Sequence, residues 1–333
     1  MSKIRVCFLL IAVMFSCSDN EITAGATGTS AETDNTNNIS LVARNYLNEV
    51  IAVMQNNSIN KYTVDWNQLR HEAFGELDVN AQTIEDTYPG ISKAIALLGD
   101  NHSLFITSTG SYINPHSNMC EGVSFSNVDV PDNIGYVKIS NFNGSSNLDG
   151  MTFAQNIQDD IIAQDHSNVE GWIVDLRANT GGNMWPMLTG VGPILGNGTS
   201  GYFVDADDVE MSFGFDNGMS ILDGNVVMEL TNSYTLINPN PKVAVLLDNG
   251  VASSGEAIAV SFINRPNTRT FGNATCGLST ANTPFVLSDG GKLVLTTAYF
   301  ADRDLNLFGE QIDPEIETSV ENTLDTAINW IVN

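Results

Sequence analysis

The chain has 333 residues, of which 42% are hydrophobic and 8% aromatic, so it is long enough to fold around one large core or two smaller ones. Its 39 acidic and 13 basic residues give a formal net charge of −26. This balance argues against binding to nucleic acid or to an anionic membrane surface by charge, because both need clustered lysine and arginine. We interpret the acidity as a source of solubility.

The first residues have the pattern of an export signal. Lys3 and Arg5 precede an apolar run over residues 6–15, which is too short to cross a bilayer but typical of a secretory signal. We predict a signal peptide over residues 1–16 and export from a bacterial cytoplasm to the periplasm, the outer membrane or the cell surface. Cys17 is a candidate for lipidation, as in bacterial lipoproteins, which would attach the protein to a membrane through lipid. The alternative is cleavage further along the chain, which discards Cys17.

A polar segment and few cysteines follow. Residues 17–40 are rich in Asp, Asn, Thr, Gly and Ala with almost no large apolar residue, which predicts a flexible tether. With Cys7 and Cys17 set aside, Cys120 and Cys276 are the one pair that could form an intramolecular disulfide. Two buried thiols are the alternative, and the sequence does not choose between them.

A small helical domain is predicted over residues 41–115. Apolar residues recur at helical spacing in three segments, 41–56, 66–74 and 84–98. Gly99 is a natural helix C-cap, and the polar turn after it carries His102. No two of the four histidines have metal-ligand spacing, so we predict no metal site.

The pattern then changes to short strands with helices between them. Residues 134–139 and 171–176 predict strands, and residues 151–162 predict the helix that connects them, which favours a parallel or mixed sheet. The second strand ends in a turn with Gly181 and Gly182, at the carboxyl end of a strand where α/β sheets bind ligands. The glycines fit neither a dinucleotide fingerprint nor a P-loop. A tight turn and an oxyanion hole remain as interpretations.

A buried strand, a sharp turn with Ser253 and an apolar helix are predicted over residues 242–264. Residues 243–247 form the continuous apolar run expected of a strand covered on both faces, and Gly250 permits the turn. Ser253 lies at the predicted helix N-terminus, where the helix dipole favours negative charge near its hydroxyl, as a nucleophile requires. The alternative is a capping box of Ser253 and Glu256, which needs no chemistry.

The carboxyl-terminal part is predicted to be rich in strands. Residues 285–287 and 292–299 flank an Asp-Gly-Gly turn and predict a hairpin, and residues 322–332 predict a final amphipathic helix. We predict one domain over residues 116–333.

Four stretches in this order resemble the carboxyl-terminal processing and tricorn-like serine peptidases. They are the turn Leu98-Gly99-Asp100-Asn101-His102-Ser103, the strand and glycine turn over 174–182, the serine turn over 252–256, and the closing segments 277–298 and 312–315. The resemblance covers most of residues 41–320. It implies an α/β fold with a ClpP/crotonase-like ββα core and the small helical domain packed beside it. Many relatives also carry a PDZ domain, but only about thirty residues separate Phe105 from Ile134, which is too few for one.

The resemblance also implies a mechanism. Relatives of the Ser-Lys type place a lysine where this chain has Leu278, so that dyad cannot form here. The tricorn-like branch takes a histidine base from the upstream turn, which His102 occupies. Ser253 is then the nucleophile, and the N–H groups of Ser254 and of the Gly181-Gly182 turn form the oxyanion hole.

A third catalytic residue would orient the histidine. Relatives take this carboxylate from near the closing segment, where Glu310 lies, and Glu310 is our candidate. Asp100 and Asp302 are the alternatives.

We therefore expect a secreted or lipid-anchored serine peptidase that hydrolyses peptide bonds in a peptide or protein substrate without a metal or an organic cofactor. Two other functions stay open. One is a binding protein that holds a peptide or an apolar ligand on the same scaffold without cleaving it. The other is an esterase that acts on non-peptide substrates.

Overall fold

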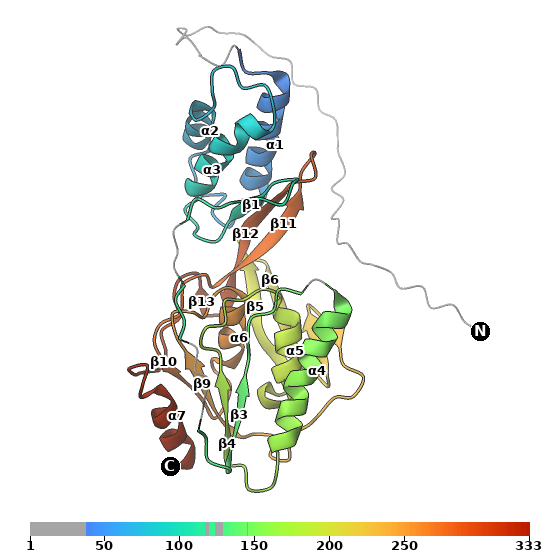
Figure 1. Cartoon of the computed structure of the whole chain (residues 1–333), viewed down its shortest axis with the longest axis vertical. Coiled ribbons are helices and arrows are strands. Elements are labelled where there is room, and N and C mark those ends of the chain that lie inside the picture. Colours follow the sequence, from blue (N-terminus) through green and yellow to red (C-terminus); the bar gives the residue numbers. More distant parts are fainter. Residues whose placement is uncertain (1–37, 117–119, 124–128, 145) are drawn as a thin grey trace, which may run out of the picture.

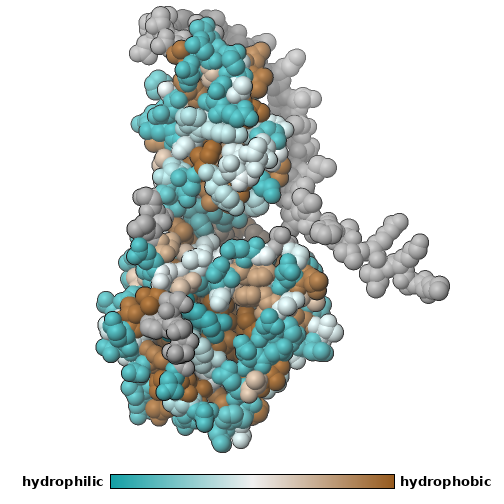
Figure 2. All heavy atoms as spheres, in the orientation of Figure 1, coloured by the Kyte–Doolittle hydropathy of each residue, from teal (hydrophilic) through white to brown (hydrophobic). Residues whose placement is uncertain are grey.

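The computed structural model describes residues 38–116, 120–123, 129–144 and 146–333. The predicted signal peptide, Cys17 and nearly all of the predicted tether lie outside these residues. Figure 1 shows a small helical part at one end of the molecule, joined through strands to a larger part that contains two sheets and the remaining helices. The space-filling view narrows between these two parts (Figure 2).

Three helices and a short 3₁₀ helix make up the helical part, as the sequence predicted. Ser40 caps the first helix by accepting from Ala43 N–H, and Asp65 caps the second by accepting from two backbone N–H groups. The predicted segment 84–98 divides into a 3₁₀ turn and a helix. The elements are α1 (Leu41–Asn57), α2 (Trp66–Gly75), η2 (Glu85–Thr87) and α3 (Tyr88–Ala96).

The core of the helical part includes strands from two distant segments of the chain. Buried side chains of α1 and α3, such as Leu47 and Ile95, share one hydrophobic cluster with Phe105, Leu293 and Leu295. The predicted boundary at residue 115 therefore does not separate two hydrophobic cores, because a hairpin from the carboxyl-terminal part completes the first one. The strands concerned are β1 (Leu104–Ile106), β2 (Tyr112–Ile113), β11 (Thr280–Val286) and β12 (Lys292–Ala301).

A nine-stranded sheet runs from the helical part into the larger part. Its order is β2-β1-β12-β5-β6-β7-β8, and β11 and β13 also pair with β12. All of these pairs are antiparallel. The strands not yet given are β5 (Gly198–Asp205), β6 (Glu210–Asp216), β7 (Met219–Leu222), β8 (Asn225–Glu229) and β13 (Leu307–Phe308).

The second sheet has five parallel strands in the order β14-β10-β9-β4-β3, which confirms the predicted mixed α/β fold. Three helices contact it: α4 contacts β3, α6 contacts β9, and α7 contacts β9, β4 and β10, while α5 packs on α4 and α6. The strands are β3 (Ile134–Lys138), β4 (Gly171–Asp175), β9 (Lys242–Leu247), β10 (Thr268–Gly272) and β14 (Ile316–Glu317); the helices are α4 (Asn147–Gln164), α5 (Met184–Leu195), α6 (Ser254–Phe262) and α7 (Thr323–Val332).

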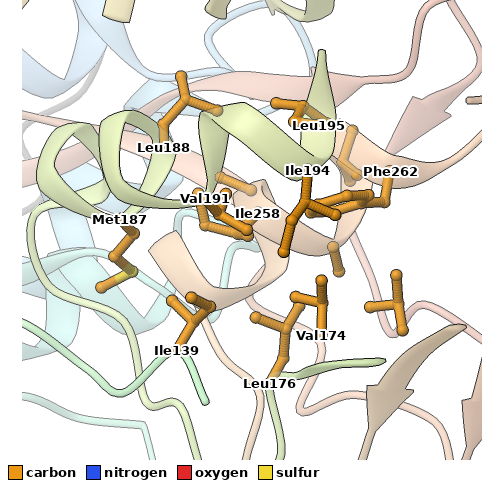
Figure 3. Packing of buried hydrophobic residues seen from close by; sticks show 14 of the residues in the cluster. Ile139, Val174, Leu176, Met187, Leu188, Val191, Ile194, Leu195, Ile258 and Phe262 are labelled. Atoms are coloured by element: carbon orange, nitrogen blue, oxygen red, sulfur yellow. The ribbon is translucent and has the colours of Figure 1, made fainter. Parts of the chain in front are cut away.

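The central strand β9 is buried on both faces, which explains its continuous apolar sequence. Val243 and Val245 pack into the large cluster with α5 and α6, whereas Ala244 and Leu246 pack into the cluster with α7. Figure 3 shows the first of these clusters, in which α5 and α6 side chains meet those of β4 and its neighbours. The turn after β9 thus follows a strand that is buried between two hydrophobic clusters.

In the part of the chain that the structure describes, no helix combines the length and the apolar character that a membrane span requires.

Candidate active site

Ser253 occupies a strained turn between β9 and α6. Its φ of 53° and ψ of −119° lie in a region that residues with a side chain rarely adopt. Such a conformation costs about 1–3 kcal/mol and persists when the surroundings enforce it. Here Ala252 N–H donates to Asn179 O at 3.0 Å, and Cys276 N–H donates to Val251 O at 2.9 Å. The strain directs attention to the serine as a functional residue.

Glu256 holds the serine turn from inside the protein. Its side chain is fully buried, and its carboxylate accepts hydrogen bonds from Ser253 N–H at 2.8 Å, Thr275 Oγ1 at 2.5 Å, Gly277 N–H at 3.0 Å and Leu278 N–H at 2.9 Å. Burial raises the pKa of Glu256 to about 7, although the four hydrogen bonds oppose that rise. The carboxylate half of the predicted capping box is therefore present, and it connects the serine turn to the loop over residues 275–278.

The glycine turn after β4 packs directly against the serine turn. Gly181 and Gly182 have φ values of 95° and 111°. A Cβ atom at Gly181 would lie 2.7 Å from Ala252 O, 2.9 Å from Ser254 N and 3.0 Å from Ser253 Cβ. Ser254 Oγ donates to Gly182 O at 2.6 Å. The structure thus brings together two turns that are about seventy residues apart, and only glycine fits at their contact.

The N–H groups of these turns differ in their availability. Gly181 N–H donates to Asn179 Oδ1 at 3.0 Å. Among the described residues, the N–H groups of Gly182 and Ser254 have no hydrogen-bond acceptor. Of the three residues predicted to form an oxyanion hole, Ser254 and Gly182 therefore carry the free donors.

His102 lies in a polar turn that Asp100 organises. Asp100 Oδ1 accepts from the N–H groups of His102 at 2.9 Å and Ser103 at 2.7 Å. His102 Nδ1 lies 2.9 Å from Thr280 Oγ1, and its carbonyl accepts from Asn282 Nδ2 at 2.9 Å. Burial lowers the pKa of His102 to about 4, while the charge of Asp100 opposes this. The imidazole is therefore neutral at neutral pH, as a general base requires.

Hydrogen bonds from one loop connect the His102 turn with the serine turn. Leu278 N–H bonds to Glu256, and two residues further on Thr280 bonds to His102. Within the described ranges, no hydrogen bond joins His102 to Ser253 directly. The predicted nucleophile and base are thus tied to neighbouring residues of the same segment, and their side chains are not in hydrogen-bond contact in this structure.

The predicted third residue, Glu310, is exposed rather than bonded to the histidine. Glu310 is exposed, and its backbone carbonyl accepts from Ser279 Oγ at 2.5 Å, but among the described residues its carboxylate forms no hydrogen bond with His102. Asp302 is buried and organises its own turn through Asp304 N–H, Asn306 and Asn264. Thr280, which the sequence analysis did not single out, is the side chain that contacts His102 Nδ1.

Sequence reasoning also missed the segment that covers the end of β9. Cys120 and Cys276 form a disulfide with their Cα atoms 5.3 Å apart, which decides between the two interpretations of these cysteines. Val123 N–H donates to Asp248 Oδ2 at 2.7 Å, and Gly122 packs against Gly250 so closely that a Cβ at Gly250 would lie 2.3 Å from Gly122 Cα. The polar turn Asp248-Asn249-Gly250 was visible in the sequence, but its partner segment, residues 120–123, is distant in sequence and could not be inferred from it.

Over the described residues, no group of three or more His, Cys, Asp or Glu side chains is arranged to hold a metal ion.

A mixed α/β fold with a serine on a strand-to-helix turn beside a glycine turn is an arrangement that serine hydrolases use. Residues 133–318 match the model of Peptidase family S41, and the chain belongs to this family. The expected relationship to carboxyl-terminal processing peptidases is confirmed. S41 proteins are peptidases, which places the chain in a hydrolase family.

Curated relatives support the same assignment. The chain is 31% identical over 281 residues to the nisin-resistance protein of Lactococcus lactis subsp. lactis, a match that covers 80% of both chains. It is 27% identical over 173 residues to the carboxy-terminal processing protease CtpA of Bacillus subtilis, and this match covers 52% of the chain but 32% of that protein.

Solved structures share the fold across most of the chain. A lipoprotein from Streptococcus agalactiae has a TM-score of 0.70 at 20% identity, with 88% of this chain and 97% of that chain covered. The photosystem II D1 C-terminal processing protease has a TM-score of 0.56 at 15% identity, with 87% and 97% covered. The helical part and the α/β core therefore occur together in these relatives.

Proposed function

We propose that the protein is an exported serine peptidase in which Ser253 is the nucleophile and His102 is the general base. The observation that carries this proposal is the strained conformation of Ser253 at the N-terminus of α6, beside the free N–H groups of Ser254 and Gly182. Membership of a peptidase family supports it.

The proposed reaction begins with proton transfer from Ser253 Oγ to His102 as the oxygen attacks the substrate carbonyl. With its proton on Nδ1, His102 donates to Thr280 Oγ1, which leaves Nε2 to accept the serine proton. The N–H groups of Ser254 and Gly182 stabilise the oxyanion. His102 then protonates the leaving amine, and a water molecule hydrolyses the acyl-enzyme by the reverse sequence of proton transfers. The Ser253–His102 contact has to form on substrate binding, as is common for catalytic hydrogen bonds.

For the third position we propose Thr280 as the residue that orients His102, because its hydroxyl contacts Nδ1. Glu310 is the alternative. Its exposed carboxylate would have to turn toward the histidine on substrate binding.

We propose nisin as the first compound to test as a substrate, because of the likeness to the Lactococcus nisin-resistance protein. The purified protein is incubated with nisin, and fragments are sought by mass spectrometry. Cleavage by the wild-type protein that is lost in Ser253→Ala and His102→Ala supports both substrate and mechanism.

A serine-reactive fluorophosphonate probe tests the function without a known substrate. Labelling at Ser253, identified by peptide mapping, is expected for the wild-type protein, and circular dichroism confirms that the Ser253→Ala control is folded. Absence of labelling in a folded wild-type protein would favour the binding-protein alternative. That alternative gains its interest from the lipoprotein and nisin-resistance relatives, whose names do not state an enzymatic activity.

We further propose that the mature protein is attached to a membrane through lipid on Cys17 and a tether over residues 17–40. The basic start, the apolar run and the polar segment support this, as does the fold shared with a protein described as a lipoprotein. Radiolabelled palmitate should enter the wild-type protein and not Cys17→Ala. Equal incorporation in both would exclude Cys17 as the lipidated residue.

A further inference from the structure

We propose that the free edge of β11 is the docking strand for the substrate, an extended peptide that joins the large sheet as an additional antiparallel strand. The proposal rests on the peptidase function proposed above and specifies how the same site binds its substrate.

The edge of β11 is available for pairing. β11 is hydrogen-bonded along its length to β12, and no other strand of the described residues pairs with it. Figure 1 shows the β11–β12 hairpin between the helical part and the larger part. Thr283, Pro284 and Val286 are exposed, and the Val286 side chain is 71% exposed. An exposed strand edge is a template for another extended chain.

The backbone groups on this edge can be assigned from the hairpin. Leu287 N–H bonds to Gly291 O at 2.8 Å, and alternate residues of an antiparallel strand turn toward the same partner. Phe285 and Thr283 therefore bond to β12, whereas Asn282, Pro284 and Val286 turn their backbone groups outward. Proline is tolerated on a strand edge because the N–H that it lacks would face away from the sheet. The edge thus offers three carbonyl acceptors and two N–H donors to a peptide.

The same strand leads into the candidate active site. It begins at Thr280, whose hydroxyl contacts His102, and the side-chain amide of Asn282 donates to the His102 carbonyl. Leu278, two residues before the strand, bonds to the glutamate that holds the Ser253 turn. A peptide that pairs with β11 is therefore delivered to the histidine. Backbone hydrogen bonds supply affinity that depends little on the side chains of the peptide.

The direction of the peptide follows from the sheet. The strands that pair with β12 are antiparallel to it, and antiparallel pairing is slightly more stable per residue. An antiparallel peptide has its carboxyl-terminal end at Thr280, so the residues before the scissile bond lie along β11. Pairing that extends to Val286 needs about six residues on the amino side of the cleaved bond.

A pair of proline variants tests this docking mode on a proteome-derived peptide mixture read by mass spectrometry. Val286→Pro removes an outward donor from β11. Val226→Pro makes the same change at an exposed valine of β8, the opposite edge of the same sheet. Losing one hydrogen bond should lower the cleavage rate about fivefold to tenfold in Val286→Pro, with Val226→Pro as the unaffected control. Val286→Ala keeps the N–H, so its cleavage rate should exceed that of Val286→Pro by a similar factor. Cleaved bonds should lie at least about six residues from peptide amino termini.

Fluorophosphonate labelling of Ser253, run in parallel, separates the two proposals. Three results would show that docking on β11 is wrong while the serine hydrolase stands, provided that the probe labels Ser253. They are cleavage by Val286→Pro at the wild-type rate, cleavage near peptide amino termini, and no cleavage of any peptide. If the probe does not label folded wild-type protein, the peptidase proposal fails and docking fails with it. Should Val286→Pro not fold, a cleaved peptide is resynthesised with single N-methyl groups. If N-methylation abolishes cleavage only at every second residue of the peptide, strand pairing is supported. If N-methylation has the same effect at every residue, strand pairing is wrong.

Discussion

The two halves of the candidate site are held in different ways. Ser253 lies between a strand buried on both faces and an almost fully buried helix, and a buried carboxylate fixes its backbone. His102 belongs to the helical part, and its ring is held by one hydroxyl from a hairpin that joins the two parts. Well-packed cores resist displacement, whereas an element supported by few contacts moves at lower cost. The comparison indicates that Ser253, the proposed nucleophile, is held more firmly than His102, the proposed base.

Displacing Ser253, the proposed nucleophile, should have the largest effect on activity. Gly181→Ala places a methyl group 2.7–3.0 Å from atoms of the serine turn. A displacement of about 1 Å costs on the order of a hundredfold in rate. We expect kcat/KM to fall by about that factor or more.

Gly196→Ala is the matched control for Gly181→Ala. Gly196 also has a positive φ, of 86°, but a Cβ there meets no atom within 4 Å. It should lose some stability through backbone strain and keep its activity. Equal loss of activity in both variants would show that strain, and not contact with the serine turn, is responsible.

Glu256→Gln tests whether the Glu256 carboxylate fixes the position of Ser253. In Glu256→Gln an amide NH₂ faces backbone donors, which should lower kcat by roughly tenfold or more and the free energy of unfolding by about 1–3 kcal/mol. Urea denaturation monitored by circular dichroism and steady-state kinetics measure the two effects. Unchanged kcat at lower stability would assign Glu256 a structural role alone.

The pKa of Glu256 adds a pH dependence to this test. Because the folded-state pKa of about 7 exceeds the ordinary value of 4.5, the folded state binds the proton more tightly, and this group's contribution to stability is lost as the pH rises from about 4.5 to about 7. The stability difference between wild type and Glu256→Gln should therefore be larger at pH 5 than at pH 7.5. A difference that grows with pH would contradict the raised pKa.

Two variants test which residue orients His102, the proposed base. Thr280→Val removes the hydroxyl that contacts His102 Nδ1 and should lower kcat about tenfold, with little change in KM. Glu310→Gln should leave kcat unchanged, because its carboxylate lies in solvent. A loss on the order of a hundredfold in Glu310→Gln, with normal activity in Thr280→Val, would instead make Glu310 the orienting residue.

The smallest expected effect is the position of the acid limb in the pH profile. With a pKa of about 4, His102 is neutral over most of the range in which an ordinary histidine becomes protonated. We expect kcat/KM to fall to half of its plateau value near pH 4. Circular dichroism at each pH should show that the protein stays folded. An acid limb near pH 6.5 would show that the histidine is solvated in the active state.

Several parts of the fold could be predicted because their signals are local. The apolar run of β9, the polar turn after it and the apolar helix α6 follow one another in sequence, so Ser253 was placed at a helix N-terminus correctly. The three amphipathic helices of the helical part were recognised for the same reason. The parallel sheet followed from alternating strands and helices.

The remaining features depend on contacts between distant residues. Cys120 and Cys276 are 156 residues apart, and the hydrogen bond between His102 and Thr280 spans 178 residues. No local pattern marks such a pairing, so the sequence left the disulfide open and did not indicate the contact between Thr280 and His102. The hairpin that completes the helical core was assigned to the other domain for the same reason.

Turns, helix starts and buried strands depend on neighbouring residues, so the sequence alone was enough to identify Ser253, His102 and the glycine turn as candidates for this site. The contact of Gly181 with Ser253, the hydrogen bonds that join Glu256 to two turns, and the contact of Thr280 with His102 arise only from long-range packing. These outcomes depend on how two sheets and a bridging hairpin pack, and packing is a property of the whole chain.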